Sequence, residues 1–290
     1  MKTGSRRDFL KKTAIFGLGA TSLPIISSAC GAKEEQVVKP AKEFGVQIYS
    51  AREQLMQDFE GTLQKIADMG YDYIEAFGLG TDGMYFGQTS PADLKAMVNG
   101  MGMRIESTHT SYFTAEDAPV MVEAAKAAGV KQLIIPYLTQ DQRTDYLAHA
   151  ENMNAVGKYF KEAGIEFGYH NHDFEFTPLE DGTLPMEILL ENTDPELVNF
   201  QLDVYWIRKA GFEPLEFLAK HPGRYTSYHV KDANTDLDQT TVGTGIIDYD
   251  TLLAKNGEVG IKYVFVEDER TDDPLANIKA AHDYLENLTF

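Results

Sequence analysis

Cysteine is almost absent from this chain, which has a single one, Cys30, among 290 residues. An internal disulfide is therefore excluded. Basic side chains are also scarce, because 26 lysines and arginines face 45 aspartates and glutamates, and the net charge is −19. Nucleic-acid binding depends on basic side chains that neutralise phosphates, so this charge argues against a nucleic-acid partner.

Long hydrophobic runs are missing as well. The apolar stretch at residues 13–26 is short for a membrane span and is interrupted by two glycines and a proline. It follows a basic start that contains Arg6-Arg7-Asp8-Phe9-Leu10, and small residues come after it. Residues 1–30 are therefore typical of an export signal. The paired arginines resemble the twin-arginine type, which exports proteins already folded.

Cys30 follows Ser-Ser-Ala and is a candidate lipidation site like that of bacterial lipoproteins. Ser27 stands where such sites usually have an aliphatic residue, so ordinary cleavage nearby with an unimportant thiol is the alternative. Residues 31–42 are polar and would form a tether. We expect an exported protein, in the periplasm or as a cell-envelope lipoprotein, with membrane contact only through the lipid anchor.

Eight short apolar runs alternate with longer amphipathic segments in the rest of the chain. The predicted strands are 44–51, 71–78, 104–112, 131–138, 165–176, 198–206, 225–233 and 261–269. The predicted helices are 52–69, 91–101, 114–129, 141–164, 185–192, 214–222, 248–259 and 273–288. Eight βα units in this length predict a (β/α)₈ TIM barrel, a single domain over residues 43–290. An open doubly wound sheet is the alternative, but no glycine-rich phosphate loop follows the first strand.

Acidic and imidazole side chains follow three consecutive strands near the end of the chain. They are Asp203, His229 and Glu267. Active sites of barrel enzymes lie at the carboxyl ends of the strands. Oxygen and nitrogen ligands of this kind suit Mn²⁺, Mg²⁺, Co²⁺ or Zn²⁺, so the pattern predicts a divalent-metal site. The alternative is that each residue belongs to an ordinary hydrogen-bond network.

Side chains alternate along a strand, so polar residues two positions apart point to the same side. His170 and His172 point the same way, as do His229 and Lys231, and Glu267 and Glu269. Glu75 and His109 stand at the ends of the second and third strands. We expect these polar groups to share partners, because unpaired burial is costly.

Six segments occur in an order that resembles the xylose-isomerase-like barrel family of sugar isomerases and epimerases, which shares its fold with endonuclease IV. They are FGVQIYSAR, HNHDFEF, LDVYW, YHVKD, VGTGIIDY and FVEDE. The resemblance implies a divalent metal, often manganese, held by Glu, Asp, His and Glu from strands five to eight. Asp203, His229 and Glu267 match the last three positions, and His170 stands at the first. His172 and Glu175 are the alternatives for this fourth ligand.

The resemblance also implies proton removal next to a carbonyl, through an enediolate that the metal stabilises. Glu267, His109 or His170 would be the base. Lys231 would neutralise developing negative charge, unless it only forms a structural ion pair. The sugar would contact a set of pocket residues, namely Tyr49, Glu75, Tyr112, His172 and Trp206.

The missing glutamate and the export signal together shape the predicted function. A symmetrical epimerisation uses two glutamates, and His170 replaces one of them. Sugar phosphates are mostly cytoplasmic, so the predicted substrate is a neutral sugar or glycoside. We expect an isomerase or epimerase-like enzyme, or a lyase or hydratase that acts on 3-keto-glycosides. The alternatives are a non-catalytic carbohydrate-binding lipoprotein and, less favoured, an endonuclease IV-like phosphodiesterase. The sequence gives no oligomeric state.

Overall fold

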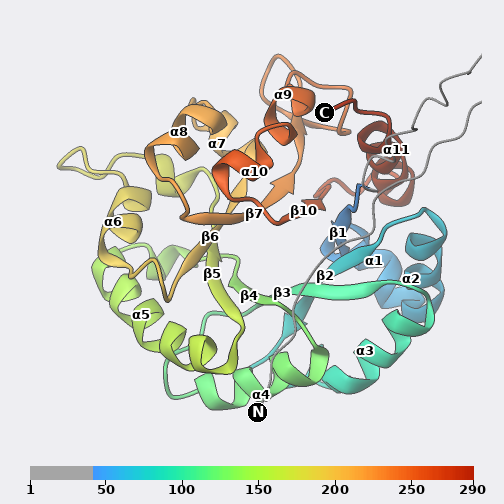
Figure 1. Cartoon of the computed structure of the whole chain (residues 1–290), viewed down its shortest axis with the longest axis horizontal. Coiled ribbons are helices and arrows are strands. Elements are labelled where there is room, and N and C mark those ends of the chain that lie inside the picture. Colours follow the sequence, from blue (N-terminus) through green and yellow to red (C-terminus); the bar gives the residue numbers. More distant parts are fainter. Residues whose placement is uncertain (1–41) are drawn as a thin grey trace, which may run out of the picture. The chain divides into compact units, whose positions relative to one another are not determined.

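The computed structural model describes residues 42–290, and in this part of the chain eight parallel strands close into a barrel. Around the barrel they follow the order β1, β2, β3, β4, β5, β6, β7, β10, which returns to β1 (Figure 1). Their bounds are β1 Gly45–Gln47, β2 Tyr73–Leu79, β3 Arg104–Thr110, β4 Gln132–Ile135, β5 Glu166–His170, β6 Asn199–Asp203, β7 Tyr225–Val230 and β10 Tyr263–Val266. The predicted single-domain (β/α)₈ barrel is confirmed, and the open sheet is wrong. The predicted export signal and Cys30 lie outside the described residues, as does the tether except Lys42.

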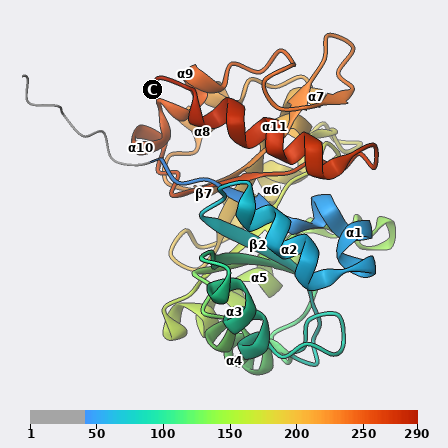
Figure 2. The same ribbon diagram turned by 90° about the vertical axis from the view of Figure 1, so that its right-hand side faces the viewer.

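Helices surround the barrel, and Figure 2 shows α11, α2 and α3 following one another along its outer surface. The helices are α1 Arg52–Gln57, α2 Phe59–Asp68, α3 Pro91–Gly100, α4 Ala118–Ala128, α5 Tyr146–Ala163, α6 Pro185–Asn192, α7 Val204–Lys209, α8 Pro214–Lys220, α9 Tyr249–Leu253, α10 Asn256–Val259 and α11 Pro274–Glu286, with short 3₁₀ turns at Ile48–Ala51, Gln140–Gln142 and Phe174–Phe176. No helix within residues 42–290 combines the length and apolar character needed to cross a bilayer.

Seven of the eight strands end earlier than predicted. In two of them, β1 and β6, the side chain at the strand end caps the helical turn that follows. The Gln47 amide oxygen accepts a hydrogen bond from the Tyr49 amide at 3.0 Å, which ends β1. Asp203 Oδ1 accepts one from the Trp206 amide at 2.9 Å, which ends β6 and begins α7. A capped turn satisfies amide groups that would otherwise lack partners. Both residues are thereby held at the carboxyl end of the barrel.

A two-stranded antiparallel ribbon between β7 and α9 was not predicted. It consists of β8, Asp232–Ala233, and β9, Gln239–Thr240. The buried Asp232 carboxylate accepts hydrogen bonds from the amides of Gly243, Gly245 and Ile247 at 3.0–3.2 Å. This single acidic side chain fixes the loop that leaves the barrel beside the site.

The barrel interior is polar at one level rather than filled with branched apolar side chains. Five fully buried residues define this level, and we call them the floor: Gln47, Glu75, Ser107, Gln132 and Gln201. Strand register aligns several of them, because Glu75 pairs with Gln47 on one side and with Ser107 on the other. Buried polar groups are tolerated only when they are hydrogen-bonded. The floor therefore fixes the side chains that rest on it.

Candidate active site

A cavity of about 710 Å³ opens at the carboxyl end of the barrel. Polar residues from the barrel line its deep part, namely His109, His170 and Glu267. Aromatic side chains from the loops line its outer part, which we call the rim, with Tyr49 and Tyr137 the most exposed of them. Binding pockets for small molecules typically have this size and this mixture of apolar walls and a few polar groups.

The three residues predicted as metal ligands lie together and are buried. Asp203, His229 and Glu267 each offer one donor atom, and these three atoms all lie within 4.8 Å of one another. His229 Nδ1 is 2.8 Å from Glu267 Oε2 and 4.0 Å from Asp203 Oδ2. Asp203 pairs directly with His229 in the strand register, which explains their proximity. We call Asp203, His229, Glu267 and the adjacent His170 the ligand cluster.

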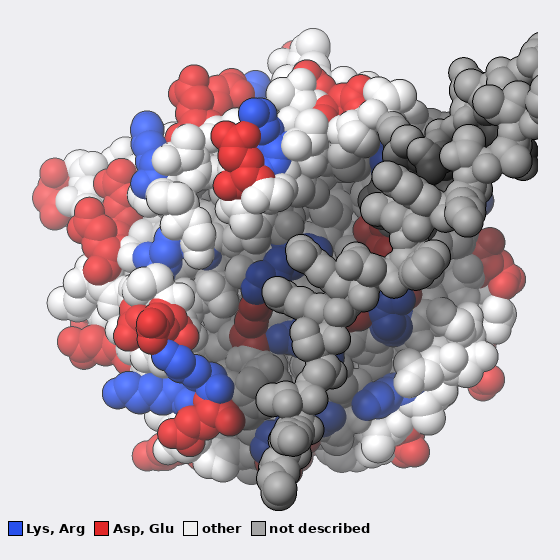
Figure 3. Space-filling model, viewed as in Figure 1, with Lys and Arg blue, Asp and Glu red and all other residues white. Residues whose placement is uncertain are grey.

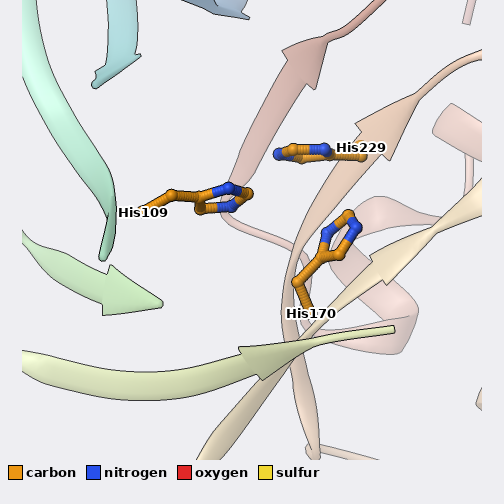
Figure 4. Close-up of side chains that lie close together, drawn as sticks. All are labelled: His109, His170 and His229. Carbon is orange, nitrogen blue, oxygen red and sulfur yellow. The ribbon is translucent and has the colours of Figure 1, made fainter. Parts of the chain in front are cut away.

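His170 is the fourth member of this cluster. Its Nε2 lies 3.6 Å from Asp203 Oδ2, and its ring lies beside those of His109 and His229 (Figure 4). Figure 4 shows the three imidazoles, from β3, β5 and β7, turned toward one another inside the barrel. The Glu175 carboxylate is buried elsewhere, where it accepts hydrogen bonds from the Tyr169 hydroxyl and the His172 amide. Of the three predicted alternatives, His170 and not Glu175 reaches the cluster.

His172 lines the cavity one step further out. Its ring contacts the His170 ring at 5.0 Å and the Trp206 ring at 5.3 Å between centroids. Its buried Nδ1 has no hydrogen-bond partner. A ligand hydroxyl in the cavity would satisfy this free nitrogen. The role of His172 as a substrate contact stays a prediction.

Lys231 places an ammonium group inside the ligand cluster. Its Nζ is 2.8 Å from Asp203 Oδ2 and 2.6 Å from Glu267 Oε2, and it also contacts Glu269. Burial would by itself lower the pKa of Lys231, but the three carboxylates outweigh it and raise this pKa well above the usual value. The same ammonium and His229 outweigh burial at Glu267 and hold its pKa well below the usual range. Both groups are therefore charged at neutral pH.

The cluster fits a divalent metal ion. It offers two carboxylates and two imidazoles, a donor set suited to manganese, cobalt or zinc. Asp203 Oδ2 is buried 2.8 Å from Lys231 Nζ and 3.6 Å from His170 Nε2, so a metal bound at this oxygen would lie beside the ammonium. A metal at these carboxylates would share them with Lys231 Nζ, which already has a further partner in Glu269.

Glu75 is not on the pocket wall, where we predicted it as a substrate contact. It is fully buried below the cluster, and its carboxylate accepts hydrogen bonds from Gln47 at 2.9 Å and Ser107 at 2.6 Å. It also contacts His229 and lies 3.2 Å from His109 Nε2. Burial would by itself raise the pKa of Glu75, but the two histidines outweigh it and lower this pKa to about 2. Glu75 therefore acts on the histidines and not on a substrate.

The remaining predicted contacts lie at two depths. Tyr49 and Tyr112 line the cavity, and the Tyr112 hydroxyl is held by His149 Nδ1 at 2.8 Å. Trp206 lies behind His172, and its indole nitrogen is buried without a partner. Trp206 thus supports the ring of His172 rather than forming the cavity surface.

Sequence reasoning missed Gln201, Ser107 and Tyr137. Gln201 stands two residues before Asp203, and Ser107 stands two residues before His109. Because side chains alternate along a strand, a polar residue two positions before a site residue points to the same interior. That spacing could have identified both.

A closed parallel barrel with acidic and imidazole side chains converging at the carboxyl ends of its strands defines the class of barrel enzymes with a divalent-metal site. Within that class the chain belongs to the xylose isomerase-like TIM barrel family, whose sequence model matches residues 63–288.

Solved structures and curated proteins show what the chain is similar to. The crystal structure of a sugar phosphate isomerase/epimerase from Parabacteroides distasonis ATCC 8503 is 28% identical, with a TM-score of 0.75 over 86% of this chain and 95% of that one. An inosose dehydratase of Bacillus cereus (strain AH820) is 28% identical over 146 residues, which cover 44% of this chain and 48% of the relative. The chain thus spans about half the length of such curated relatives.

A zinc-containing structure shares the fold. The IOLI protein with a bound zinc atom has a TM-score of 0.66 at 18% identity and covers 85% of this chain and 98% of its own. At this identity the likeness shows the shared fold.

Proposed function

We propose that this protein is a metal-dependent lyase that removes the proton next to the keto group of a neutral 3-keto-glycoside and expels the aglycone. The observation that carries the proposal is the asymmetry of the cluster. The Glu267 carboxylate, which is paired with the buried Lys231, borders the cavity together with the imidazoles of His109 and His170. Burial lowers the pKa values of His109 and His170, so both are neutral at pH 7. At His229 the carboxylates of Glu75 and Glu267 outweigh burial and raise the pKa to about 10. A symmetrical epimerisation would use two equivalent carboxylate bases, and the cavity does not offer such a pair.

The lining of the cavity favours an uncharged substrate. Among the described residues that line it, none is a lysine or an arginine, and two are glutamates, Glu267 and Glu269. A phosphate would meet negative charge at this wall. Acidic and basic side chains are mixed on the visible part of the face in Figure 3. This charge pattern also disfavours an endonuclease-like activity.

The reaction would proceed by proton transfer and elimination. His109 accepts the proton from C2, and the electron pair of the broken C–H bond forms the enediolate across C2 and C3. Manganese, which we propose as the bound ion, supplies Lewis-acid stabilisation of the charge on the C3 oxygen. Lys231 adds a fixed positive charge beside it. The C3 carbonyl then re-forms, and the electron pair of the C2–C3 double bond makes a C1–C2 double bond. The C1–O bond breaks, and the aglycone leaves with its electron pair and takes up the proton that His109 holds.

The inosose dehydratase likeness supports a lyase, because the dehydratase name denotes an elimination. The likeness to an isomerase/epimerase supports the second candidate, an isomerase with the same enediolate and no bond cleavage. A non-catalytic carbohydrate-binding protein would not need the buried, charged cluster. Export to the cell envelope remains our proposal from residues 1–30.

A 3-keto-glucoside with a nitrophenyl aglycone tests the proposal, assayed with manganese and with EDTA. We expect metal-dependent release of nitrophenolate. Exchange of the C2 hydrogen with deuterated solvent without nitrophenolate release would favour the isomerase instead. Absence of both reactions in the manganese-loaded protein would contradict both candidates.

A further inference from the structure

The floor touches three histidines of the site, His109, His170 and His229, through two side chains, Gln201 and Glu75. We propose that Gln201 fixes which nitrogen of His109 and His170 carries a proton, that Glu75 holds the proton on His229 Nε2, and that the two residues thereby present His170 Nε2 and His229 Nδ1 to the metal. The inference rests on the proposed metal site and adds residues that act through the ligands. Gln201 and Glu75 are positioning residues, since neither borders the cavity.

The orientation of the Gln201 amide follows from its neighbours. Gln201 Nε2 lies 2.9 Å from Glu75 Oε1. A carboxylate only accepts hydrogen bonds, so the NH₂ group must face Glu75 and the carbonyl oxygen must face the histidines. The Gln47 amide and the Ser107 hydroxyl also donate to this carboxylate. The amide therefore presents an acceptor, and only an acceptor, to the rings above it.

That acceptor determines the tautomers of two neutral histidines. His170 Nδ1 lies 3.0 Å and His109 Nε2 lies 2.9 Å from the Gln201 Oε1 atom. Each of these nitrogens must carry a hydrogen to bond to an acceptor, and the carbonyl has two lone pairs for them. The other nitrogen of each ring then has a free lone pair. For His170 this is Nε2, the atom 3.6 Å from Asp203 Oδ2 in the ligand cluster.

Glu75 acts on His229 in a different way. The Nε2 atom of His229 contacts Glu75 Oε2, and its Nδ1 atom contacts Glu267 Oε2 at 2.8 Å. A carboxylate only accepts hydrogen bonds, so both nitrogens carry hydrogens in the metal-free protein. A metal would displace the hydrogen on Nδ1, while the buried Glu75 would keep the one on Nε2. Carboxylates behind metal-binding histidines orient the ring and raise its basicity, and their loss typically costs about 10–100-fold in metal affinity.

The barrel contains a matched control. Gln132 is also a fully buried glutamine of the floor, but its nearest polar partners are Ser227 Oγ at 3.2 Å and Thr226 Oγ1 at 3.4 Å. Its hydrogen bonds reach no histidine. Gln201→Leu and Gln132→Leu therefore remove the same buried amide, and only the first removes the acceptor from the histidines.

Nitrogen-15 NMR of histidine-labelled, metal-free full-length protein reads the tautomers directly. In the unmodified protein we expect the Nδ1–H form for His170 and the Nε2–H form for His109. The reverse tautomer at either histidine would overturn the proposal. This measurement does not depend on whether the variants fold. In Gln201→Leu both rings should become tautomer mixtures, while Gln132→Leu should leave them unchanged. Equal changes in the two variants would also overturn the proposal.

Manganese affinity, measured by calorimetry on the same proteins, gives the second readout. We expect a loss of about 10–100-fold in Gln201→Leu and in Glu75→Gln, and wild-type affinity in Gln132→Leu. Unchanged manganese affinity in both Gln201→Leu and Glu75→Gln would overturn the proposed link to the metal. If the unmodified protein binds no manganese, the proposed metal-dependent function fails, while the NMR result still decides the tautomers.

Discussion

The floor and the rim of the cavity are built in opposite ways. On the floor, Glu75 and Gln201 are fully buried, and each polar atom meets a partner from another strand. On the rim, Tyr49 and Tyr137 remain 40% and 44% exposed. Their rings are nevertheless positioned, because the Arg52 guanidinium lies 4.6 Å from the Tyr49 ring centroid and that of Arg143 lies 4.9 Å from Tyr137.

The difference indicates that the atoms above the floor carry out the reaction and that the rim selects the substrate. A fully paired buried network has one low-energy arrangement, so the atoms above it are pre-organised for reaction. An exposed but positioned aromatic ring offers an apolar face at little entropic cost, which suits recognition of a sugar or aglycone. Damage to the cluster above the floor should thus abolish the reaction, and damage to the rim should change which substrate reacts.

The largest effect is expected for Asp203→Ala, which removes a carboxylate from the ligand cluster. Metal stabilisation of an enediolate contributes several kcal/mol, so kcat/KM should fall by about 10³-fold or more. Elemental analysis should find manganese in the unmodified protein and little in the variant. Asp181→Ala, in an exposed loop, is the control and should change neither value. A variant that keeps its metal and its activity would contradict the role of the cluster.

Lys231→Met should destabilise the metal-free protein by about 3–5 kcal/mol, because it leaves buried carboxylates without their cation. Bound manganese would replace that cation, so the variant should gain more thermal stability from manganese than the unmodified protein does. Melting curves with and without manganese measure this. Lys255→Met removes an exposed pair with Glu258 and should cost less than about 1 kcal/mol. An equal response to manganese in the two variants would show that Lys231 does not share the metal's carboxylates.

The barrel and its ligand cluster were predictable because they repeat a simple pattern. Alternating apolar and amphipathic segments identify the strands and helices, and parallel strands bring their carboxyl ends together. Asp203, His229 and Glu267 stand at those ends in three consecutive strands, so their convergence follows from topology alone.

The floor was harder to predict, since its polar residues are interrupted by apolar neighbours and read as parts of buried strands. Glu75 was visible in the sequence, but its depth depends on the register between β2 and its neighbours, with shifts at Ile74/Glu75 in the pairing to β3. Tyr137 follows Pro136 beyond the end of β4, and nothing in its local sequence distinguishes a rim residue from a packed one. Tertiary contacts, rather than periodicity, determine both positions.

Glu175 lies in the 3₁₀ turn after β5, where it contacts the Tyr169 hydroxyl and the His172 amide, and it should make stability depend on pH. Burial raises its pKa from 4.5 to about 7. The folded protein therefore holds this proton more tightly than the unfolded chain, and the stability is present below pH 4.5 and lost as the pH rises through about 7. The loss should be about 3 kcal/mol at most.

Urea unfolding at pH 5 and pH 8 measures this loss. Glu175→Gln cannot ionise, so its stability should change less between the two pH values than that of the unmodified protein. Glu180→Gln, at an exposed position, should behave as the unmodified protein does. The same pH dependence in all three proteins would assign it to other groups.

The smallest effect is expected at the rim. Tyr137 contacts His172 and Phe174 edge-on, at 5.1 and 5.6 Å between ring centroids, and keeps an exposed surface at the cavity. Aromatic contacts contribute about 0.5–1.5 kcal/mol, so Tyr137→Ala should lower kcat/KM for a nitrophenyl 3-keto-glucoside by up to about tenfold. The value for the methyl 3-keto-glucoside should change little, because the methyl aglycone does not reach the ring.

Tyr159 on α5 provides the matched control, since it is 42% exposed and does not line the cavity. Tyr159→Ala should leave the ratio of the two kcat/KM values unchanged. If Tyr137→Ala instead lowers both values equally, the ring supports the reacting atoms as the floor does, and the division between a chemical floor and a selective rim fails. If only the nitrophenyl substrate suffers, the rim selects the aglycone while the cluster performs the chemistry.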